Sequence, residues 1–239
     1  MKTTRVLHMQ RGFTRSAPPM LYRTDLAYIH HAGFSEFARS SAPYVISLLP
    51  PHARVVEVGC GSGILARVLT DAGFTVHGFD ASSAMIALAR ETAPDAQLEV
   101  ASFEQAALPP CDAVVAMGEV LNYGDIRAFL PRASAALETG GLLLFDVAER
   151  GSYPRYDEVR TGGDDWSVIA IKESDGVKVT RRVLTFRETS RDEEVHTLSL
   201  YDREELLALL RPHFQVRVRK SYGARRLPKG HAVYVCIKR

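Results

Sequence analysis

Hydrophobic and polar positions alternate in blocks along the chain from about residue 43 to residue 146. Four short runs are apolar almost throughout, which is typical of strands buried on both faces. These runs cover residues 54–58, 74–79, 112–117 and 142–145. A less apolar run at 97–101 predicts a further short strand. Between the strands, apolar side chains recur at the spacing of one helix face. These helical segments cover residues 64–72, 82–94 and 125–138. Short strands that alternate with helices predict a parallel sheet covered on both faces.

The two flanks of this block have different patterns. Residues 20–50 predict two or three helical pieces, broken at Gly33 and Pro43. Period-two alternation between turn signals predicts antiparallel strands in the region 150–200. These strands cover residues 166–172, 177–186 and 194–200. Asp202 is a predicted N-cap for a helix that ends near Leu210, and alternating valines predict two last strands.

We therefore predict one α/β domain over residues 1–239, with a doubly wound, seven-stranded, mostly parallel sheet. The domain begins with a flexible lead-in (1–20) and a helical cap (21–50), which precede the core (51–149). An antiparallel insertion on the substrate side (150–200) follows, and a last helix with the final strands (201–239) completes the domain. The fold class is thus a Rossmann-like sheet with an N-terminal helical cap and an added antiparallel sheet.

Composition narrows the class of protein. Hydrophobic residues make up 46% and charged residues 24%, which is ordinary for a globular chain and argues against disorder. With 30 basic and 28 acidic residues, the net charge of +2 gives no argument for polyanion binding by the whole chain. The three cysteines lie far apart without a CxxC pair, so we expect no disulfide framework and no metal site.

The N-terminal residues are basic and lack acids before Asp25. Such a start would fit a transit peptide, but Pro18-Pro19 and the missing apolar region favour a disordered basic lead-in. No apolar run reaches the roughly 18 residues of a membrane span. We therefore expect a cytoplasmic protein that makes no membrane contact.

The most informative segment is the sequence EVGCGSG over residues 57–63, which follows a buried strand and opens a helix. Glycines there let the backbone turn sharply and approach a ligand closely. A dinucleotide fingerprint would need Gly or Ala at position 64, where this chain has Ile64. Asp80 ends the next strand, where a carboxylate can accept both hydroxyls of a ribose. An unmodified ribose and a loop without lysine suit a nucleoside that lacks phosphates.

The segment EVGCGSG, an aspartate at the end of the second strand, and Gly140-Gly141 before the fifth resemble the class I S-adenosylmethionine-dependent methyltransferases. The resemblance covers about residues 43–150 by motif and 200–239 by strand pattern. Segments 25–34, 118–123 and 194–197 also resemble a large set of uncharacterised bacterial methyltransferases of small-molecule type. The resemblance implies S-adenosyl-L-methionine as cofactor and S-adenosyl-L-homocysteine as product.

By this resemblance, Gly59, Gly61 and Gly63 lie under the methionine part of the cofactor. Glu57 orients the loop or reaches the cofactor amino group through water, and Asp80 binds the ribose. Ser102 and Phe103 flank the adenine, although many family members have Asp where Ser102 stands. The remaining cofactor-binding candidates are Tyr22, His30, Ala81, Met85, Met117 and Gly118.

Methyl transfer from a sulfonium mostly needs alignment of the reactants, because the leaving group is a neutral thioether. A base matters only when the acceptor carries a proton at neutral pH. His196 on a predicted strand is a candidate base or substrate ligand, the alternative being an ordinary sheet histidine. Glu119, after the fourth strand, is a candidate to steady the sulfonium or bind an acceptor amine. The substrate-binding candidates are Tyr28, Asn122, Tyr123 and Trp166. For Tyr28 the alternative role is packing of the cap, and for Trp166 it is anchoring of the added strands.

Several rival functions stay open at this point. Residues 211–239 hold nine basic residues and no acidic one, which is typical of nucleic-acid contacts. However, Arg217 and Arg219 alternate with valines as on a solvated strand face, and the Asn/Asp-Pro-Pro-Tyr motif for base amines is absent. A protein or peptide methyltransferase, a nicotinamide dehydrogenase and a noncatalytic binding module are further alternatives. We expect methyl transfer to oxygen or nitrogen of a small metabolite by a monomer or homodimer, with RNA or protein as the alternative acceptor.

Overall fold

The computed structural model describes residues 21–239. The lead-in predicted for residues 1–20 lies outside the described residues. From residue 21 onward, no helix is long and apolar enough to cross a membrane. The three cysteines, Cys60, Cys111 and Cys236, are buried free thiols.

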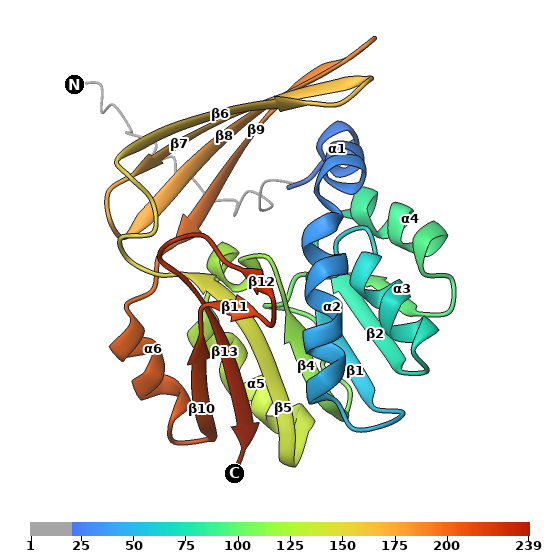
Figure 1. The fold of residues 1–239 in the computed structure, drawn as a ribbon, viewed down its shortest axis with the longest axis vertical. Helices are drawn as coiled ribbons and strands as arrows, with labels where there is room; N and C mark the ends of the chain where they lie inside the picture. The colour runs from blue at the N-terminus through green and yellow to red at the C-terminus, as the bar shows by residue number, and fades with distance from the viewer. Residues whose placement is uncertain (1–20) are drawn as a thin grey trace, which may run out of the picture.

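The main sheet has seven strands and occupies the lower part of the molecule in Figure 1. In spatial order these are β10 (Phe214–Arg219), β13 (His231–Lys238), β5 (Leu137–Ala148), β4 (Cys111–Ala116), β1 (Arg54–Val58), β2 (Thr75–Asp80) and β3 (Gln97–Val100). Neighbours from β5 to β3 pair in parallel, and β13 is antiparallel to both β5 and β10. The predicted seven-stranded, mostly parallel sheet is confirmed.

Helices cover both faces of the main sheet because alternate residues of its strands are apolar on either side. On one face, α2 (Glu36–Leu48) and α3 (Ile64–Asp71) pack against Leu144 of β5. On the other, α5 (Ile126–Ala136) and α6 (Arg203–Leu210) pack against its neighbour Phe145. This arrangement leaves the carboxyl ends of the parallel strands free for a site.

Side-chain caps begin two of the helices in the way that the sequence predicts. Ser82 accepts the Met85 N–H at the start of α4 (Ser83–Thr92). Asp202 accepts two N–H groups at the start of α6. These caps satisfy amides that a helix leaves unpaired at its first turn, and the first of them fixes α4 at the edge where β2 ends.

A second sheet of four antiparallel strands, here called the added sheet, is inserted between β5 and α6 and lies above the main sheet in Figure 1. Its strands are β6 (Tyr156–Gly162), β7 (Trp166–Ser174), β8 (Lys178–Arg187) and β9 (Arg191–Ser199). Helix α1 (Thr24–Phe34) packs against α4 and against this sheet, where Leu26 and Ile29 contact Val168 and Val183. The predicted cap and insertion therefore cover the same edge of the main sheet.

The cap and the strand edges differ from the prediction in detail. The break expected at Gly33 falls two residues later, at Ser35 between α1 and α2, whereas the break expected at Pro43 is wrong because α2 contains Pro43. Packing of Val45 on the sheet offsets the N–H that a proline removes from a helix. The sequence pattern does not reveal β6, since most of its residues are exposed and it pairs only with β7. A short hairpin, β11 (Ser221–Tyr222) and β12 (Arg225–Arg226), is also new.

Candidate functional site

The glycine loop between β1 and α3 is tied to the end of β2. The N–H groups of Gly59 and Cys60 donate to the Phe79 carbonyl at 2.7 and 3.0 Å. A Cβ at Gly59 would meet Val120 at 2.4 Å, so this glycine permits close packing. Gly61 has a φ of +53°, and a Cβ there would meet nothing within 4 Å. The loop is therefore packed from below at Gly59 and open at Gly61, as a ligand cradle requires.

Two carboxyl groups flank the open part of this loop. Asp80 accepts the Gly61 N–H at 3.0 Å and the Ser82 N–H at 2.8 Å, which leaves each of its oxygens a free lone pair. Burial raises the pKa of Asp80, and these two N–H groups oppose that shift. Glu57 is 5% exposed, and its Oε2 atom has no hydrogen-bond partner among the described residues. Burial, with the nearby charge of Asp80, raises the pKa of Glu57 to about 8.

An unpartnered carboxyl and a carboxylate with spare acceptors fit the groups of S-adenosylmethionine. The Glu57 carboxyl would face its amino group, and Asp80 would accept hydrogen bonds from its ribose hydroxyls. The open space over Gly61 leaves room for a ligand against the backbone. Among the predicted cofactor residues, Ala81 is exposed and Met85 is buried beneath this edge.

The adenine side agrees less well with the predicted roles. Phe103 is 8% exposed and its ring packs edge-to-face on Phe129, 5.6 Å between centroids, inside the core. Ser102 is half-buried, and its carbonyl accepts the Gln105 and Ala106 N–H groups in a turn. The structure thus gives Phe103 a core position, because the chain turns inward directly after β3.

Residue Tyr22 joins the cap to the cofactor edge and to the added sheet. It has a φ of +51°, and its carbonyl accepts the Ser82 hydroxyl at 2.7 Å. The Glu194 carboxylate of β9 accepts the N–H groups of Tyr22 and Arg23 at 2.6 and 2.8 Å. The Tyr22 ring packs edge-to-face on His30, whose pKa burial lowers to about 4. His30 is therefore a neutral imidazole at this position.

His196 belongs to a chain of polar groups, here called the His196 relay, that consists of Tyr22, Tyr123, His196 and Glu194. His196 is 1% exposed, and its Nε2 lies 3.0 Å from Glu194. Its Nδ1 lies 3.5 Å from the Tyr123 hydroxyl, which lies 3.4 Å from the Tyr22 hydroxyl. The predicted base and substrate residue are thus brought together under the cap, and Tyr22 is the outer end of the relay.

Glu119 sits after β4 with a φ of +63°, a left-handed conformation that is rare for this residue type. Buried Asp146 at the end of β5 holds this turn by accepting the N–H groups of Gly118 and Glu119 at 2.8 and 3.0 Å. The Tyr222 hydroxyl also donates to Asp146. Asp146 is a positioning residue that the sequence pattern does not reveal, because a strand-ending aspartate resembles any other.

The Glu119 side chain lies in a polar group here called the Arg181 cluster, which consists of Glu119, Tyr153, Arg181 and His231. Glu119 accepts hydrogen bonds from Tyr153 at 2.8 Å, His231 at 2.6 Å and Arg181 at 3.1 Å. Burial alone would raise the pKa of Glu119, but these partners outweigh it and lower the pKa to about 2. Glu119 is therefore ionised and already satisfied, which fits a charged wall better than a proton acceptor.

Three members of the Arg181 cluster are absent from the sequence prediction. Arg181 comes from β8, Tyr153 from the segment before β6, and His231 from β13. The Arg181 guanidinium also donates to Tyr153 at 3.0 Å and lies 3.4 Å from the Tyr123 hydroxyl. It therefore connects the Arg181 cluster with the His196 relay. No local motif marks these residues, since they meet only in the folded chain.

Asn122 does not line the acceptor side. Its amide donates to the carbonyls of Ala148 and Ser199 and accepts the Ala148 N–H at 3.0 Å, and it is fully buried. All of its hydrogen-bonding atoms are thus taken by backbone groups of two sheets. The structure corrects its predicted role from substrate contact to a tie between β5 and β9.

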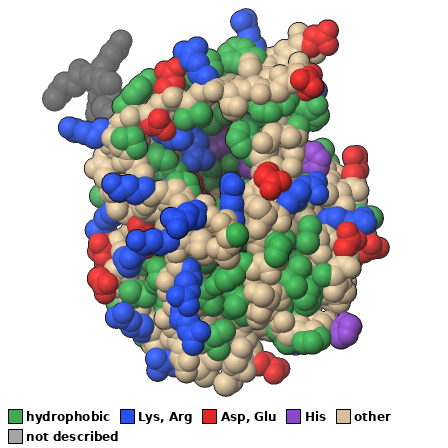
Figure 2. All heavy atoms as spheres, in the orientation of Figure 1, with side chains coloured by type: hydrophobic (Ala, Val, Ile, Leu, Met, Phe, Trp, Pro, Cys, Tyr) green, Lys and Arg blue, Asp and Glu red, His purple; other side chains and the backbone are tan. Residues whose placement is uncertain are grey.

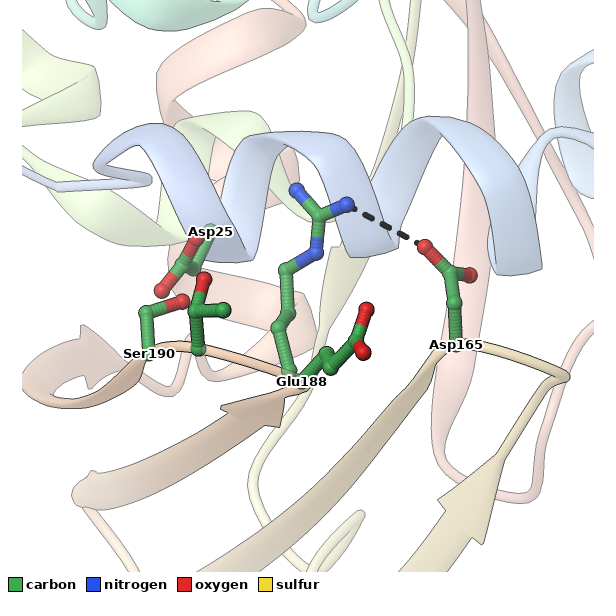
Figure 3. A pocket seen from close by; sticks show the side chains of 6 residues that line it. Asp25, Asp165, Glu188 and Ser190 are labelled. Atoms are coloured by element: carbon green, nitrogen blue, oxygen red, sulfur yellow. Dashed lines mark hydrogen bonds and ion pairs between the residues drawn. The ribbon is translucent and has the colours of Figure 1, made fainter.

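Tyr28 and Trp166 lie where the cap meets the added sheet. The Arg187 guanidinium stacks 3.7 Å from the Tyr28 ring centroid, and both side chains bond to Asp165. Figure 3 shows the Arg187–Asp165 pair in a pocket of about 270 Å³ beside Asp25 on α1. A Cβ at Gly33 would meet Trp166 at 2.5 Å. Both aromatic residues therefore join cap to sheet, and their substrate role stays a prediction.

Replacing Asn122 by Ala should lower the free energy of unfolding by about 2–4 kcal/mol, because buried backbone groups lose their partners. Urea unfolding followed by circular dichroism measures this loss. Gln215→Ala on exposed β10 is the control and should change stability by less than about 0.5 kcal/mol. A small loss for Asn122→Ala would contradict the structural role.

A carboxyl with a raised pKa makes stability fall as pH rises, since the unfolded chain releases its proton first. Between pH 4.5 and about 8, Glu57 should therefore reduce the free energy of unfolding by a few kcal/mol. In Glu57→Gln this loss should vanish, so the variant gains stability relative to the wild type from pH 5 to pH 8. Urea unfolding at several pH values measures the difference, with exposed Glu138→Gln as control. Parallel curves for all three proteins would show that Glu57 is ionised in the fold.

Comparison with known proteins agrees with this geometry. The family described as a methyltransferase domain matches residues 29–211. Ubiquinone biosynthesis O-methyltransferase of Bradyrhizobium sp. (strain ORS 278) is 31% identical over 132 residues, 52% of this chain and 50% of that protein. Trans-aconitate 2-methyltransferase of Variovorax paradoxus (strain S110) is 34% identical over 117 residues, 47% of this chain and 45% of that protein. The chain thus spans about half the length of these curated relatives.

A solved structure extends the comparison to the whole fold. The sugar N-methyltransferase from Streptoalloteichus sp. superposes with a TM-score of 0.70 at 21% identity, covering 100% of this chain and 98% of that one. At this identity the likeness shows a shared fold, including the added sheet within the aligned length. Since the family match extends over most of the sequence, the chain belongs to the methyltransferase-domain family and has the class I fold of S-adenosylmethionine-dependent methyltransferases.

Proposed function

We propose that this protein transfers a methyl group from S-adenosylmethionine to oxygen or nitrogen of a small metabolite. The observation that carries the proposal is the meeting of two sites at one sheet edge. The open glycine loop with Asp80 and Glu57 lies on one side of this edge. The Arg181 cluster lies on the other, and Val120 next to Glu119 packs directly against Gly59.

Support for a small acceptor comes from the relatives and from the enclosure of the site. The two similar enzymes and the similar structure are named for methylation in ubiquinone biosynthesis, of trans-aconitate and of a sugar. The added sheet and α1 cover the carboxyl edge of the main sheet, and Glu194 ties the two together. Such an enclosure suits a metabolite better than a long polymer.

When bound, S-adenosylmethionine supplies an electrophilic methyl group and leaves as a neutral thioether. Glu57 binds the cofactor amino group, Asp80 holds the ribose, and the Gly61 backbone supports the chain between them. The Glu119 carboxylate is already held by Arg181 and His231, so it serves as a fixed polar wall at this edge. These residues orient the donor, and orientation is the main contribution that such a displacement needs.

On the acceptor side, the His196 relay offers a path for the proton that a hydroxyl or ammonium acceptor must lose. Tyr22 is the relay's outer end, and burial raises the pKa of its hydroxyl, so it stays protonated. As the Tyr22 oxygen takes the proton of the acceptor, its own proton passes along Tyr123 to the His196 imidazole, whose position Glu194 fixes. A carboxylate acceptor would need no such relay.

The substrate class is tested with methyl-labelled S-adenosylmethionine and a cell extract that is split into small-molecule, RNA and protein fractions. Label in the small-molecule fraction is the expected result. Label in RNA or protein would keep the chemistry and contradict the acceptor class. Heat-inactivated protein serves as the control for transfer by other enzymes.

Asp80→Ala should weaken S-adenosylmethionine binding by at least about tenfold, or 1.4 kcal/mol, because the ribose loses its acceptor. Isothermal titration calorimetry measures the affinity, and thermal unfolding checks that the variant folds. Asp112→Ala is the matched control, since Asp112 pairs with Arg54 at the opposite end of the sheet. Equal affinity of the wild type and Asp80→Ala would remove the ribose assignment.

His196→Ala should slow turnover by roughly 10²-fold or more for a hydroxyl or ammonium acceptor, as expected for loss of a general base. The affinity for S-adenosylmethionine should stay unchanged. Initial rates across pH measure the effect, because loss of a base also removes the acidic limb of the profile. Exposed His213→Ala is the control. Normal turnover with an unaltered pH profile would reduce His196 to a structural role.

A further inference from the structure

An open cleft of about 480 Å³ lies where the β11–β12 hairpin meets the start of β13. Its charged lining residues are Arg203, Lys220, Arg226, Lys229 and His231, joined by the backbone of residues 227–230. In the space-filling view, Lys and Arg side chains gather on this face, near a hollow between the added sheet and the main sheet (Figure 2). Neither the predicted cofactor residues nor the relay uses this cleft.

The charge in the cleft is largely uncompensated. Among residues 21–239, Lys220, Arg226 and Lys229 form no ion pair within 4.0 Å, and no acidic residue lines the cleft. Arg203 differs, because it pairs with buried Glu149. Three exposed cations around one concave site are a strong attraction for an anion.

His231 adds a buried cation to the wall of the cleft. Its side chain is 5% exposed, with Nε2 2.6 Å from the Glu119 carboxylate and Nδ1 3.3 Å from the Lys229 carbonyl. Both neighbours can only accept hydrogen bonds, so both ring nitrogens carry protons. Burial alone would lower the pKa of His231, but the hydrogen bond and charge of Glu119 outweigh it and raise the pKa. The wall is therefore fixed by the ion pair of His231 with Glu119, and the attraction for an anion comes from the three exposed cations.

This same histidine connects the cleft with the proposed reaction edge. His231 bonds to Glu119, the next residue is Val120, and Val120 packs against Gly59 of the glycine loop. The cleft wall and the reaction edge thus share the His231–Glu119 pair, so the cleft adjoins the acceptor side.

We propose that this cleft binds a phosphate or carboxylate group of the methyl acceptor, so that the enzyme acts on an anionic small metabolite. This inference rests on the proposed function and deepens it. Lys220, Arg226 and Lys229 bind the anion, and His231 sets its distance from the reacting edge. The anionic group of the acceptor thus serves for recognition and is not changed by the reaction.

A long polyanion such as RNA fits this face less well than a compact anion. On the α6 side the cleft is bordered by the acidic residues Asp202, Glu204 and Glu205, of which the two glutamates are exposed. Arg150 pairs with Asp202 and Glu205, whereas Glu204 forms no ion pair among the described residues. Phosphates that continue beyond the cleft in this direction would meet the like charge of Glu204.

The test measures binding of pyrophosphate and of citrate to the full chain by isothermal titration calorimetry at low salt. At least one of them should bind, and the two probes distinguish a phosphate from a carboxylate group. The triple variant Lys220→Ala, Arg226→Ala, Lys229→Ala should weaken that binding by at least about tenfold. The control triple Lys178→Ala, Arg191→Ala, Arg211→Ala removes the same charge elsewhere and should leave the binding unchanged. Failure of both probes to bind, or equal loss in both triples, would overturn the inference.

Two further arms separate this inference from the proposed function. S-adenosylmethionine binding, measured on the same samples, should be equal in the wild type and both triples, so a missing anion site is not confused with a missing cofactor site. The methyl-labelled product from the small-molecule fraction should be retained on an anion-exchange resin, and an unretained product overturns the inference.

A single-stranded RNA of about 20 nucleotides should bind no more tightly than the better probe at physiological salt. Tighter RNA binding that the first triple abolishes would overturn it in favour of a nucleic-acid acceptor.

Discussion

Four carboxyl groups lie close together in a nearly water-free region at the carboxyl edge of the main sheet. The site depends on keeping these four groups from repelling one another. The charge of each carboxyl group is removed or balanced in a different way. Glu57 is neutralised by a raised pKa, Asp80 bonds to backbone N–H groups, and Asp146 bonds to backbone and a tyrosine. Only Glu119 is balanced by cations from other elements, Arg181 and His231. One sheet edge therefore offers a neutral carboxyl, a carboxylate with free lone pairs and an ion-paired carboxylate in distinct places.

The acceptor side depends on contacts between segments that are remote in the sequence. Glu194 of the added sheet binds the first N–H groups of the cap and also His196, so the cap and the relay share one carboxylate. Ser82 then connects Tyr22 to the cofactor edge. Cap, added sheet and core therefore form one site, in which a shift of the cap changes the surroundings of the reacting groups.

The sequence predicts the core well because its signals are local. Apolar strands, the glycine loop and the caps at Ser82 and Asp202 each lie within a few residues of their partners, and the main sheet confirms them. The Arg181 cluster has no such signal, since Glu119 and His231 are 112 residues apart and meet only by sheet pairing. An exposed edge strand such as β6 lacks apolar alternation, and a buried amide such as Asn122 is indistinguishable in sequence from a ligand-binding one.

The added sheet leaves the core and returns to it at nearly one point. Glu149 forms a parallel bridge with Tyr201, and the Arg150 N–H donates to the Tyr201 carbonyl at 2.9 Å. An insertion whose ends already touch adds little strain to its host, whatever its length. The four strands can therefore change in length or number without a change in the core that carries the glycine loop. Methyltransferases that share such a core can differ in the acceptor that they modify.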